Sequence, residues 1–217
     1  MISFKQFITE GAAFDLEKFK TDCAFILSEL KGGNKLLWHG TDTAPPDWQI
    51  KQWKERTEPR DSSKVAHDQF NSLFTKMFGF PIRNWLFTTS YERDAAQYDS
   101  LVSKACAIFP IGKFDWVQGQ DDNLRDLSMW HARELNLLGH RLPTKDSLSA
   151  DEKQIIITDM LLKKIPNMKW KHNTDFDGCL HLDNEIMIKC DKFYLINGKS
   201  PTLRLILKTC DIEVELQ

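Results

Sequence analysis

Three short apolar runs that end in polar residues stand out in the hydrophobic pattern of the chain. They are residues 36–42 (LLWHGTD), 85–90 (WLFTTS) and 183–188 (DNEIMI). Side chains of a strand alternate between two faces, and an apolar run anchors a strand in the core. We therefore predict three strands that carry polar side chains to the rim of a sheet and converge on one cleft.

Apolar residues at helical spacing predict helices in other parts of the chain. These helices cover residues 14–31, about 63–78, 90–98, 122–138 and 149–164. Ser62 or Ser63 can cap the second helix and Gly79 can end it. Ser149 and Glu152 form a capping-box pattern at the start of the last helix. Residues 49–60 are polar, and they are predicted to form either a solvated loop or a segment whose Lys51, Lys54, Arg56 and Arg60 face a polyanionic ligand.

Short strands are predicted for most of the remaining chain. They cover residues 105–111, 178–182, 185–190, 193–196, 203–208 and 212–216. Asn197 and Gly198 tolerate positive φ and predict a hairpin turn. Helices that come early and antiparallel strands that come late indicate an α+β fold.

Composition narrows the class of protein further. A chain of 217 residues with 41% hydrophobic content can bury the core of one domain, and its net charge of -2 does not favour nonspecific attraction to nucleic acid. The five cysteines include no CxxC pair, so we expect reduced thiols and no metal site. No run approaches the roughly 20 apolar residues of a membrane span, so no membrane partner is expected. Neither GxGxxG nor a P-loop motif is present, which disfavours Rossmann-type and P-loop nucleotide binding.

The three apolar runs resemble the ADP-ribosyltransferase superfamily. His39 and Gly40 resemble the His-Gly pair of the poly(ADP-ribose) polymerase and diphtheria-toxin branch, whereas residues 87–90 (FTTS) resemble the aromatic-Ser-Thr-Ser strand of the arginine-toxin branch. Residues 184–188 (NEIMI), followed by 193–196 (FYLI), resemble the Asn-Glu and Tyr-Leu strands of the polymerase branch. The order agrees across about residues 36–208. The resemblance implies a split antiparallel β-sandwich core with flanking helices, in a single domain over residues 11–217.

The resemblance also implies catalytic roles. Cleavage of the nicotinamide–ribose bond builds positive charge on the sugar, and a fixed carboxylate stabilises that charge. Glu185 is the candidate carboxylate, and its alternative is an exposed residue at a strand edge. His39 would hydrogen-bond a ribose hydroxyl, and its alternative is a core histidine. Ser90 would orient Glu185, and its alternative is a helix N-cap.

NAD is the implied substrate, and several residues are candidates for binding it. The Gly40 backbone can hold the nicotinamide carboxamide, because a glycine lets a ligand approach closely. Tyr98 can stack on nicotinamide or pack in the core. The complete candidate set for NAD binding is His39, Gly40, Thr41, Phe87, Thr89, Ser90 and Tyr98.

Two departures from the family leave the acceptor open. His39 stands where the toxin branch carries Arg, and Asp183 stands where arginine-modifying toxins carry Glu and others carry Gln. The leading prediction is a mono-ADP-ribosyltransferase that modifies a host protein or nucleic acid and releases nicotinamide. The alternatives are an NAD glycohydrolase, an inactive protein that binds a host defence factor or DNA, and an RNA 2′-phosphotransferase.

The first ten residues (MISFKQFITE) resemble the capsid-targeting leader of T-even-type phage internal head proteins. In that family a prohead protease cuts after a Glu that precedes a small residue, as Glu10 precedes Gly11 here. The resemblance implies a cleavable leader over residues 1–10, packaging inside the virion and entry into the host cytoplasm after injection. The alternative is the first turn of a helix with Phe4, Phe7 and Ile8 on one side.

Overall fold

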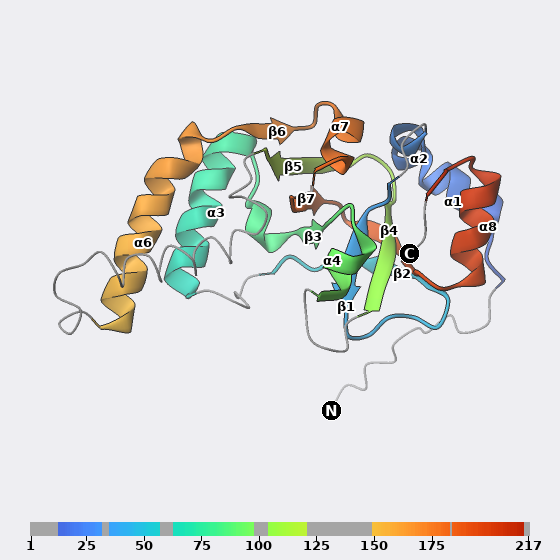
Figure 1. The fold of residues 1–217 in the computed structure, drawn as a ribbon, viewed down its shortest axis with the longest axis horizontal. Helices are drawn as coiled ribbons and strands as arrows, with labels where there is room; N and C mark the ends of the chain where they lie inside the picture. The colour runs from blue at the N-terminus through green and yellow to red at the C-terminus, as the bar shows by residue number, and fades with distance from the viewer. Residues whose placement is uncertain are drawn as a thin grey trace.

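The fold is α+β, with two antiparallel sheets at its centre and helices around them (Figure 1). The computed structural model describes residues 13–31, 35–56, 63–97, 104–120, 149–182 and 184–214. The predicted leader, the predicted helix over residues 122–138, Tyr98 and Asp183 lie outside these ranges.

Within the described residues, each sheet has four strands. The first sheet has the order β1-β4-β8-β2, from β1 (Trp38–Thr41), β4 (Lys104–Pro110), β8 (Lys192–Asn197) and β2 (Trp48–Gln52). The second has the order β3-β7-β5-β6, from β3 (Leu86–Thr88), β7 (Ile186–Lys189), β5 (Asp115–Gly119) and β6 (Trp170–His172). All neighbouring strands within a sheet are antiparallel.

The sheets meet at their edge strands, β1 and β3. The Trp38 N–H donates to the Thr89 carbonyl over 2.7 Å, and the Thr89 N–H donates back to the Trp38 carbonyl over 2.9 Å. This is an isolated bridge, so β1 and β3 touch there and then separate. The first two predicted site strands are therefore neighbours at the junction of the sheets.

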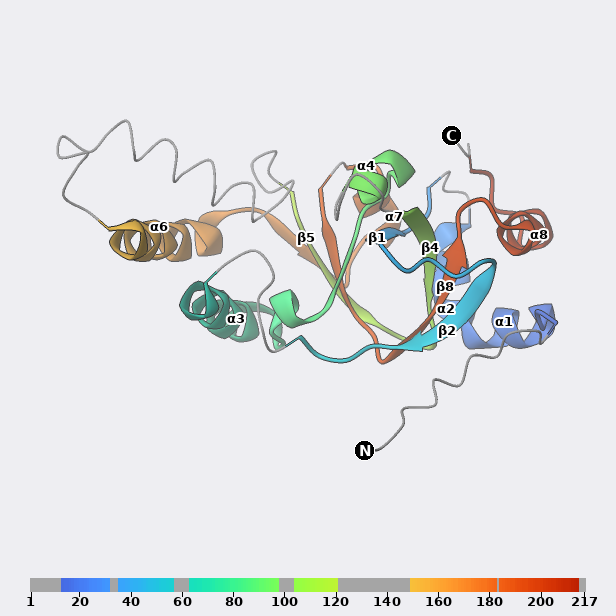
Figure 2. The ribbon, with the colours of Figure 1, turned by 90° about the horizontal axis from the view of Figure 1, so that it is seen from below.

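Helices cover the two sheets from opposite ends of the molecule (Figure 2). At one end lie α3 (Lys64–Phe78) and α6 (Ala150–Lys164). At the other lie α1 (Leu16–Asp22), α2 (Ala24–Leu30) and α8 (Pro201–Thr209), with α4 (Glu92–Gln97) and α7 (Phe176–Leu180) between the groups. Two apolar clusters result among the described residues. One joins α1, α2, α7 and α8 to the first sheet and to one face of the second sheet, and the other lies between the opposite face of the second sheet and α3 and α6.

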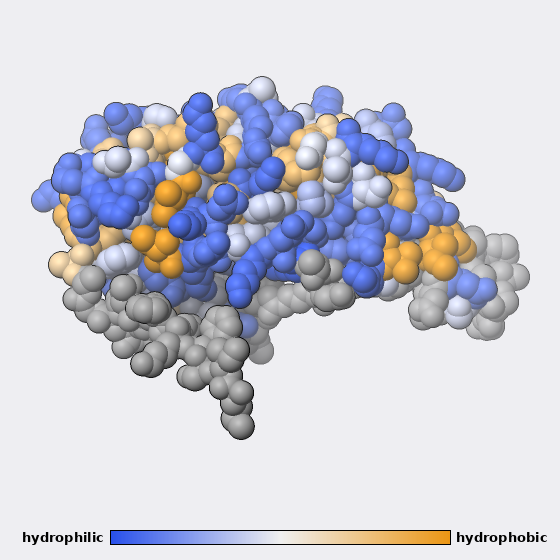
Figure 3. All heavy atoms as spheres, turned by 180° about the vertical axis from the view of Figure 1, so that it is seen from behind, coloured by the Kyte–Doolittle hydropathy of each residue, from blue (hydrophilic) through white to orange (hydrophobic). Residues whose placement is uncertain are grey.

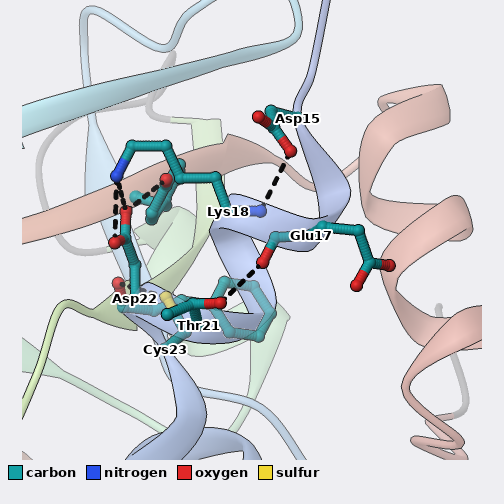
Figure 4. A network of polar contacts seen from close by, with 8 residues as sticks. Asp15, Glu17, Lys18, Thr21, Asp22 and Cys23 are labelled. Carbon is teal, nitrogen blue, oxygen red and sulfur yellow. Dashed lines mark hydrogen bonds and ion pairs between the residues drawn. The ribbon is translucent and has the colours of Figure 1, made fainter.

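The predicted helix over residues 14–31 is divided into α1 and α2 at Cys23, whose φ is -105° and ψ is 14°. Contacts with the first sheet hold the break. The Cys23 thiol lies 3.8 Å from the Phe109 carbonyl, and Asp22 accepts hydrogen bonds from Tyr194 and Lys18. Figure 4 shows the Lys18 side chain reaching along α1 to Asp22. The apolar period predicted the buried face, but contacts with distant strands decided the break.

Local capping signals correctly predicted two helices. The Ser63 hydroxyl accepts from the Ala66 N–H at the start of α3, and Gly79 ends that helix with φ 84°. Ser149 and Glu152 form the complete capping box of α6. Each signal depends on neighbouring residues alone, which is why the sequence suffices to predict it.

The predicted loop over residues 49–60 is wrong in its first part, because residues 48–52 form the edge strand β2. This strand pairs with β8 from Trp48 opposite Ile196 to Gln52 opposite Lys192. Its side chains are half-buried or exposed, so it lacks the apolar pattern of a core strand. Backbone pairing with β8 stabilises it instead.

The prediction of strands throughout the C-terminal part is also wrong in several places. Residues 176–180 form α7, residues 201–209 form α8, and residues 212–214 form no strand. Asn197 and Gly198 lead from β8 into α8 rather than into a hairpin. A Ser200 cap followed by Pro201 begins α8, and Leu203, Ile206 and Leu207 form its buried face. This cap and its 3.6-residue period were present in the sequence.

No helix among the described residues is long and apolar enough to cross a membrane. The face of the molecule seen in Figure 3 is mostly hydrophilic, and its hydrophobic atoms form separate patches. All five cysteines are free thiols, and four of them are buried.

The buried thiols predict a loss of stability at alkaline pH. Burial raises the pKa of Cys106 from 9.0 to about 11 and that of Cys190 from 9.0 to about 12. Unfolded thiols therefore ionise first, and the free energy of unfolding should fall as pH rises above 9.0. The expected slope is roughly 1 kcal/mol per pH unit for each such thiol. Urea unfolding under reducing conditions should show a shallower decline in Cys190→Ala, and equal slopes would contradict the prediction.

Candidate functional site

The three predicted site strands lie next to one another. In β3 and β7, Phe87 is opposite Met187 and Thr88 is opposite Ile186. Continuing this register by one residue sets Glu185 opposite Thr89, which in turn is bridged to Trp38 of β1. Trp38 and Thr89 are thus bridged at the junction of the two sheets, and Glu185 directly precedes the strand that pairs with β3.

His39 connects β1 to β3 through its side chain. Its Nδ1 lies 2.8 Å from the Phe87 carbonyl oxygen. A carbonyl can only accept, so Nδ1 donates in this contact. The ring is half-buried beside the strand junction.

Gly40 directs its backbone groups toward the place where the strands separate. The Ile108 N–H donates to the Leu37 carbonyl, so residues 37, 39 and 41 point their backbone groups toward β4. Gly40 then faces the opposite edge, as Trp38 does in bonding to Thr89. The N–H and the C=O of Gly40 therefore lie beyond the last hydrogen bond between β1 and β3. This donor and acceptor pair matches the two kinds of polar group in a carboxamide.

Neighbouring polar residues stabilise the backbone at the junction. The Thr41 hydroxyl accepts from the Thr43 N–H, and the Thr89 hydroxyl accepts from the Tyr91 N–H, each over 3.3 Å. Ser90 is buried, and its hydroxyl donates to the Leu182 carbonyl over 3.1 Å. The predicted N-cap role of Ser90 is not observed, because this hydroxyl reaches the segment before Glu185 and α4 begins at Glu92.

Glu185 is held by its neighbours on both sides. The Asn184 amide donates to the Gly119 carbonyl over 2.7 Å, and the Gln118 amide donates to the Asn184 carbonyl over 3.1 Å. On the other side, the Thr88 hydroxyl donates to the Ile186 carbonyl over 2.8 Å. Glu185 is only 6% exposed, so the alternative of an exposed strand-edge residue is wrong.

Gln118 is a neighbour of the candidate site that the sequence analysis missed. It lies in β5, is fully buried, and bonds to both Cys179 and Asn184. The available signal was an amide directly after the alternating residues 114–117 (FDWV), because a buried amide needs hydrogen-bond partners.

A small cavity of about 10 Å³ lies against Glu185. Phe87 and Arg83 also line it, and the Arg83 guanidinium carbon lies 5.8 Å from the centre of the Phe87 ring. Such a volume holds about one water molecule. A ligand as large as a nucleotide can therefore reach the carboxylate through this cavity only if the Phe87 or Arg83 side chain moves.

A polar network on α3 supports the segment that carries Arg83. The Asn84 carboxamide oxygen accepts from His67 over 2.9 Å and from Asn71 over 2.6 Å, and Asn71 accepts from the Arg83 N–H over 3.0 Å. Burial is the main cause that lowers the pKa of His67, so this histidine favours its neutral form. The short 3-10 helix Ile82–Asn84 is thus attached to α3 by uncharged groups.

No group of three or more His, Cys, Asp or Glu side chains within the described ranges is arranged to hold a metal ion.

Replacing Ser90 by Ala should destabilise the protein while leaving its fold intact. The change removes the buried hydroxyl that donates to the half-buried Leu182 carbonyl, and loss of a partner at a buried site costs about 1–3 kcal/mol. Urea unfolding measures the effect. Ser28→Ala is the matched control, because Ser28 makes a similar bond to Phe25 at an exposed site. An equal effect of both substitutions would contradict the assigned role.

Comparison with known proteins does not assign the chain to a family. No model of a protein family matches it, and neither curated proteins nor solved structures provide a significant match.

Proposed function

We propose that the protein is an NAD-dependent mono-ADP-ribosyltransferase. The observation that carries the proposal is the meeting of the three stretches at the sheet junction. Trp38 is bridged to Thr89, β3 pairs with β7, and Glu185 directly precedes β7 and is held from both sides. A resemblance spread over distant parts of the sequence thus corresponds to one location in the fold. The superfamily fold, a split antiparallel β-sandwich, is part of the proposal.

The proposed reaction breaks the bond between the nicotinamide nitrogen and ribose C1′. The electron pair leaves with nicotinamide, and the ribose acquires oxocarbenium character that the Glu185 carboxylate stabilises. His39 Nε2 accepts from a ribose hydroxyl, while the Gly40 backbone groups hold the carboxamide. The acceptor then attacks C1′ and gives its proton to a base, for which Glu185 is the candidate.

The acceptor is proposed to be a host macromolecule. This step rests on the resemblance of residues 1–10 to a phage capsid-targeting leader, which implies delivery of the protein with the phage DNA. A catalytically inactive binding protein is the second candidate, and the nearly filled cavity at Glu185 favours it. Water as the acceptor would make the protein an NAD glycohydrolase on the same fold.

The test combines the full chain with NAD labelled in its adenylate part and a bacterial lysate. Nicotinamide release and macromolecule-bound label are followed together, with Glu185→Gln as the inactive control. Label on protein or nucleic acid that disappears in the control supports the transferase. Nicotinamide and free ADP-ribose alone indicate the glycohydrolase, and the absence of both products rejects enzymatic use of NAD under these conditions.

A further inference from the structure

A second polar groove lies beside α4, away from the small cavity at Glu185. It has a volume of about 630 Å³ and is bounded by α4, the start of β4 and the turn after β8. Figure 1 shows α4 in front of β1 and beside β4, both of which it contacts. The groove has the size of a small-molecule site. Its charged lining residues are Glu92, Arg93, Lys104 and Lys199.

Glu92 forms the inner wall of this groove. A Cβ atom added at Gly198 would lie 3.1 Å from a Glu92 carboxylate oxygen and 3.0 Å from the Trp38 ring. The carboxylate therefore lies close to the turn backbone and beside the Trp38 side chain. Burial raises the pKa of Glu92, and none of the hydrogen bonds between described residues uses its carboxylate. An acceptor group thus faces the groove from a half-buried position.

Three exposed cations surround this carboxylate. They are Arg93, Lys104 and Lys199, and within the described ranges neither lysine forms an ion pair. Arg93 lies 3.8 Å from Asp94. Among the described residues that line the groove, cations outnumber carboxylates, although the whole chain has a net charge of -2. A local excess of cations favours an anionic ligand.

We propose that this groove binds the ribose-phosphate unit of a nucleotide. Lys104 and Lys199 neutralise the phosphate, and the Glu92 carboxylate accepts hydrogen bonds from the ribose hydroxyls. Lysine is a common phosphate ligand, and carboxylates bind ribose hydroxyls in dinucleotide sites. An acidic peptide fits less well, because its carboxylates would be repelled by Glu92 and it has no vicinal hydroxyl groups.

The groove is distinct from the proposed NAD site. Consecutive residues of a strand point to opposite faces, so the Trp38 side chain and the His39 side chain lie on different faces of β1. The groove is on the Trp38 side, since a Cβ atom added at Gly198 would meet both the Trp38 ring and the Glu92 carboxylate. The proposal therefore does not depend on the transferase activity.

Calorimetric titration of the full chain with AMP, dAMP and inorganic phosphate tests this proposal in the absence of NAD. We expect Lys104→Glu/Lys199→Glu to weaken AMP binding by at least about tenfold, because both phosphate contacts become repulsive. Glu92→Ala should weaken AMP binding and remove the preference for AMP over dAMP. Lys192→Glu/Lys208→Glu is the control with the same change in net charge, on exposed lysines outside the groove.

Unchanged AMP affinity in the groove variants, or an equal loss in the control, would overturn the proposal. The proposal is also overturned if the wild-type protein binds no AMP, or if it binds AMP and dAMP equally. A short single-stranded RNA distinguishes the source of the nucleotide. If the RNA binds more tightly than AMP and the same variants weaken its binding, the ligand is an RNA strand. Equal binding of RNA and AMP indicates a free nucleotide. If the charge reversals fail to fold, Lys199→Ala at the exposed lysine replaces them. Glu185→Gln should bind AMP normally, which separates this result from the fate of the transferase proposal.

Discussion

Glu185→Gln is expected to lower the rate of nicotinamide release from NAD by at least about 100-fold, the usual effect of removing a group that stabilises transition-state charge. Gln has nearly the shape of Glu but has no negative charge to oppose the oxocarbenium charge. The surrounding bonds from Asn184, Gln118 and Thr88 involve backbone groups and other side chains, so they can persist in the variant.

The control for this prediction is Glu213→Gln, which makes the same chemical change at an exposed residue. It should leave the rate of nicotinamide release unchanged. Thermal unfolding of both variants shows whether a loss of activity comes from a loss of structure. A Glu185→Gln protein that retains its melting temperature and at least half of the wild-type rate would refute the assigned role of Glu185 and the proposed mechanism.

Phe74→Ala is expected to lower the free energy of unfolding by about 3–5 kcal/mol, as deletion of a buried aromatic ring generally does. Phe74 is fully buried in the core between α3 and the second sheet. Its ring packs against Phe78 and Trp170 at centroid distances of 6.1 Å and 5.6 Å. Removing it also enlarges the cavity beside Glu185, which Phe74 lines.

Val65→Ala provides a control on the same helix. Val65 is 61% exposed, so its truncation should change the free energy of unfolding by less than about 0.5 kcal/mol. Urea titration followed by far-ultraviolet circular dichroism measures both variants. Similar stabilities of Phe74→Ala and the wild type would contradict the packing of α3 on the second sheet.

Sequence reasoning succeeded where one neighbourhood of the chain contains the whole signal. Ser63 and Gly79 mark the ends of α3, and Ser149 with Glu152 marks the start of α6. The apolar run of β4 also identified a buried strand. The hydrophobic pattern of α8 was taken for that of a strand, although Ser200 and Pro201 already indicated a helix start.

Tertiary contacts decided the elements that have weak local signals. The edge strand β2 exists through pairing with β8, and Cys23 divides the first helix where it meets Phe109. Neither partner is close in the sequence. A reading of local periodicity therefore had no access to the interaction that stabilises either feature.

The sequence by itself determined the α+β class and identified the three stretches that meet at the junction of the sheets. It did so because alternation and capping are properties of short segments. Only the tertiary structure decided that Ser90 bonds to Leu182, that Gln118 and Asn184 hold the backbone beside Glu185, and that this carboxylate is buried. Those features depend on hydrogen bonds between residues more than 60 positions apart, since the Gln118–Asn184 pair alone spans 66 positions.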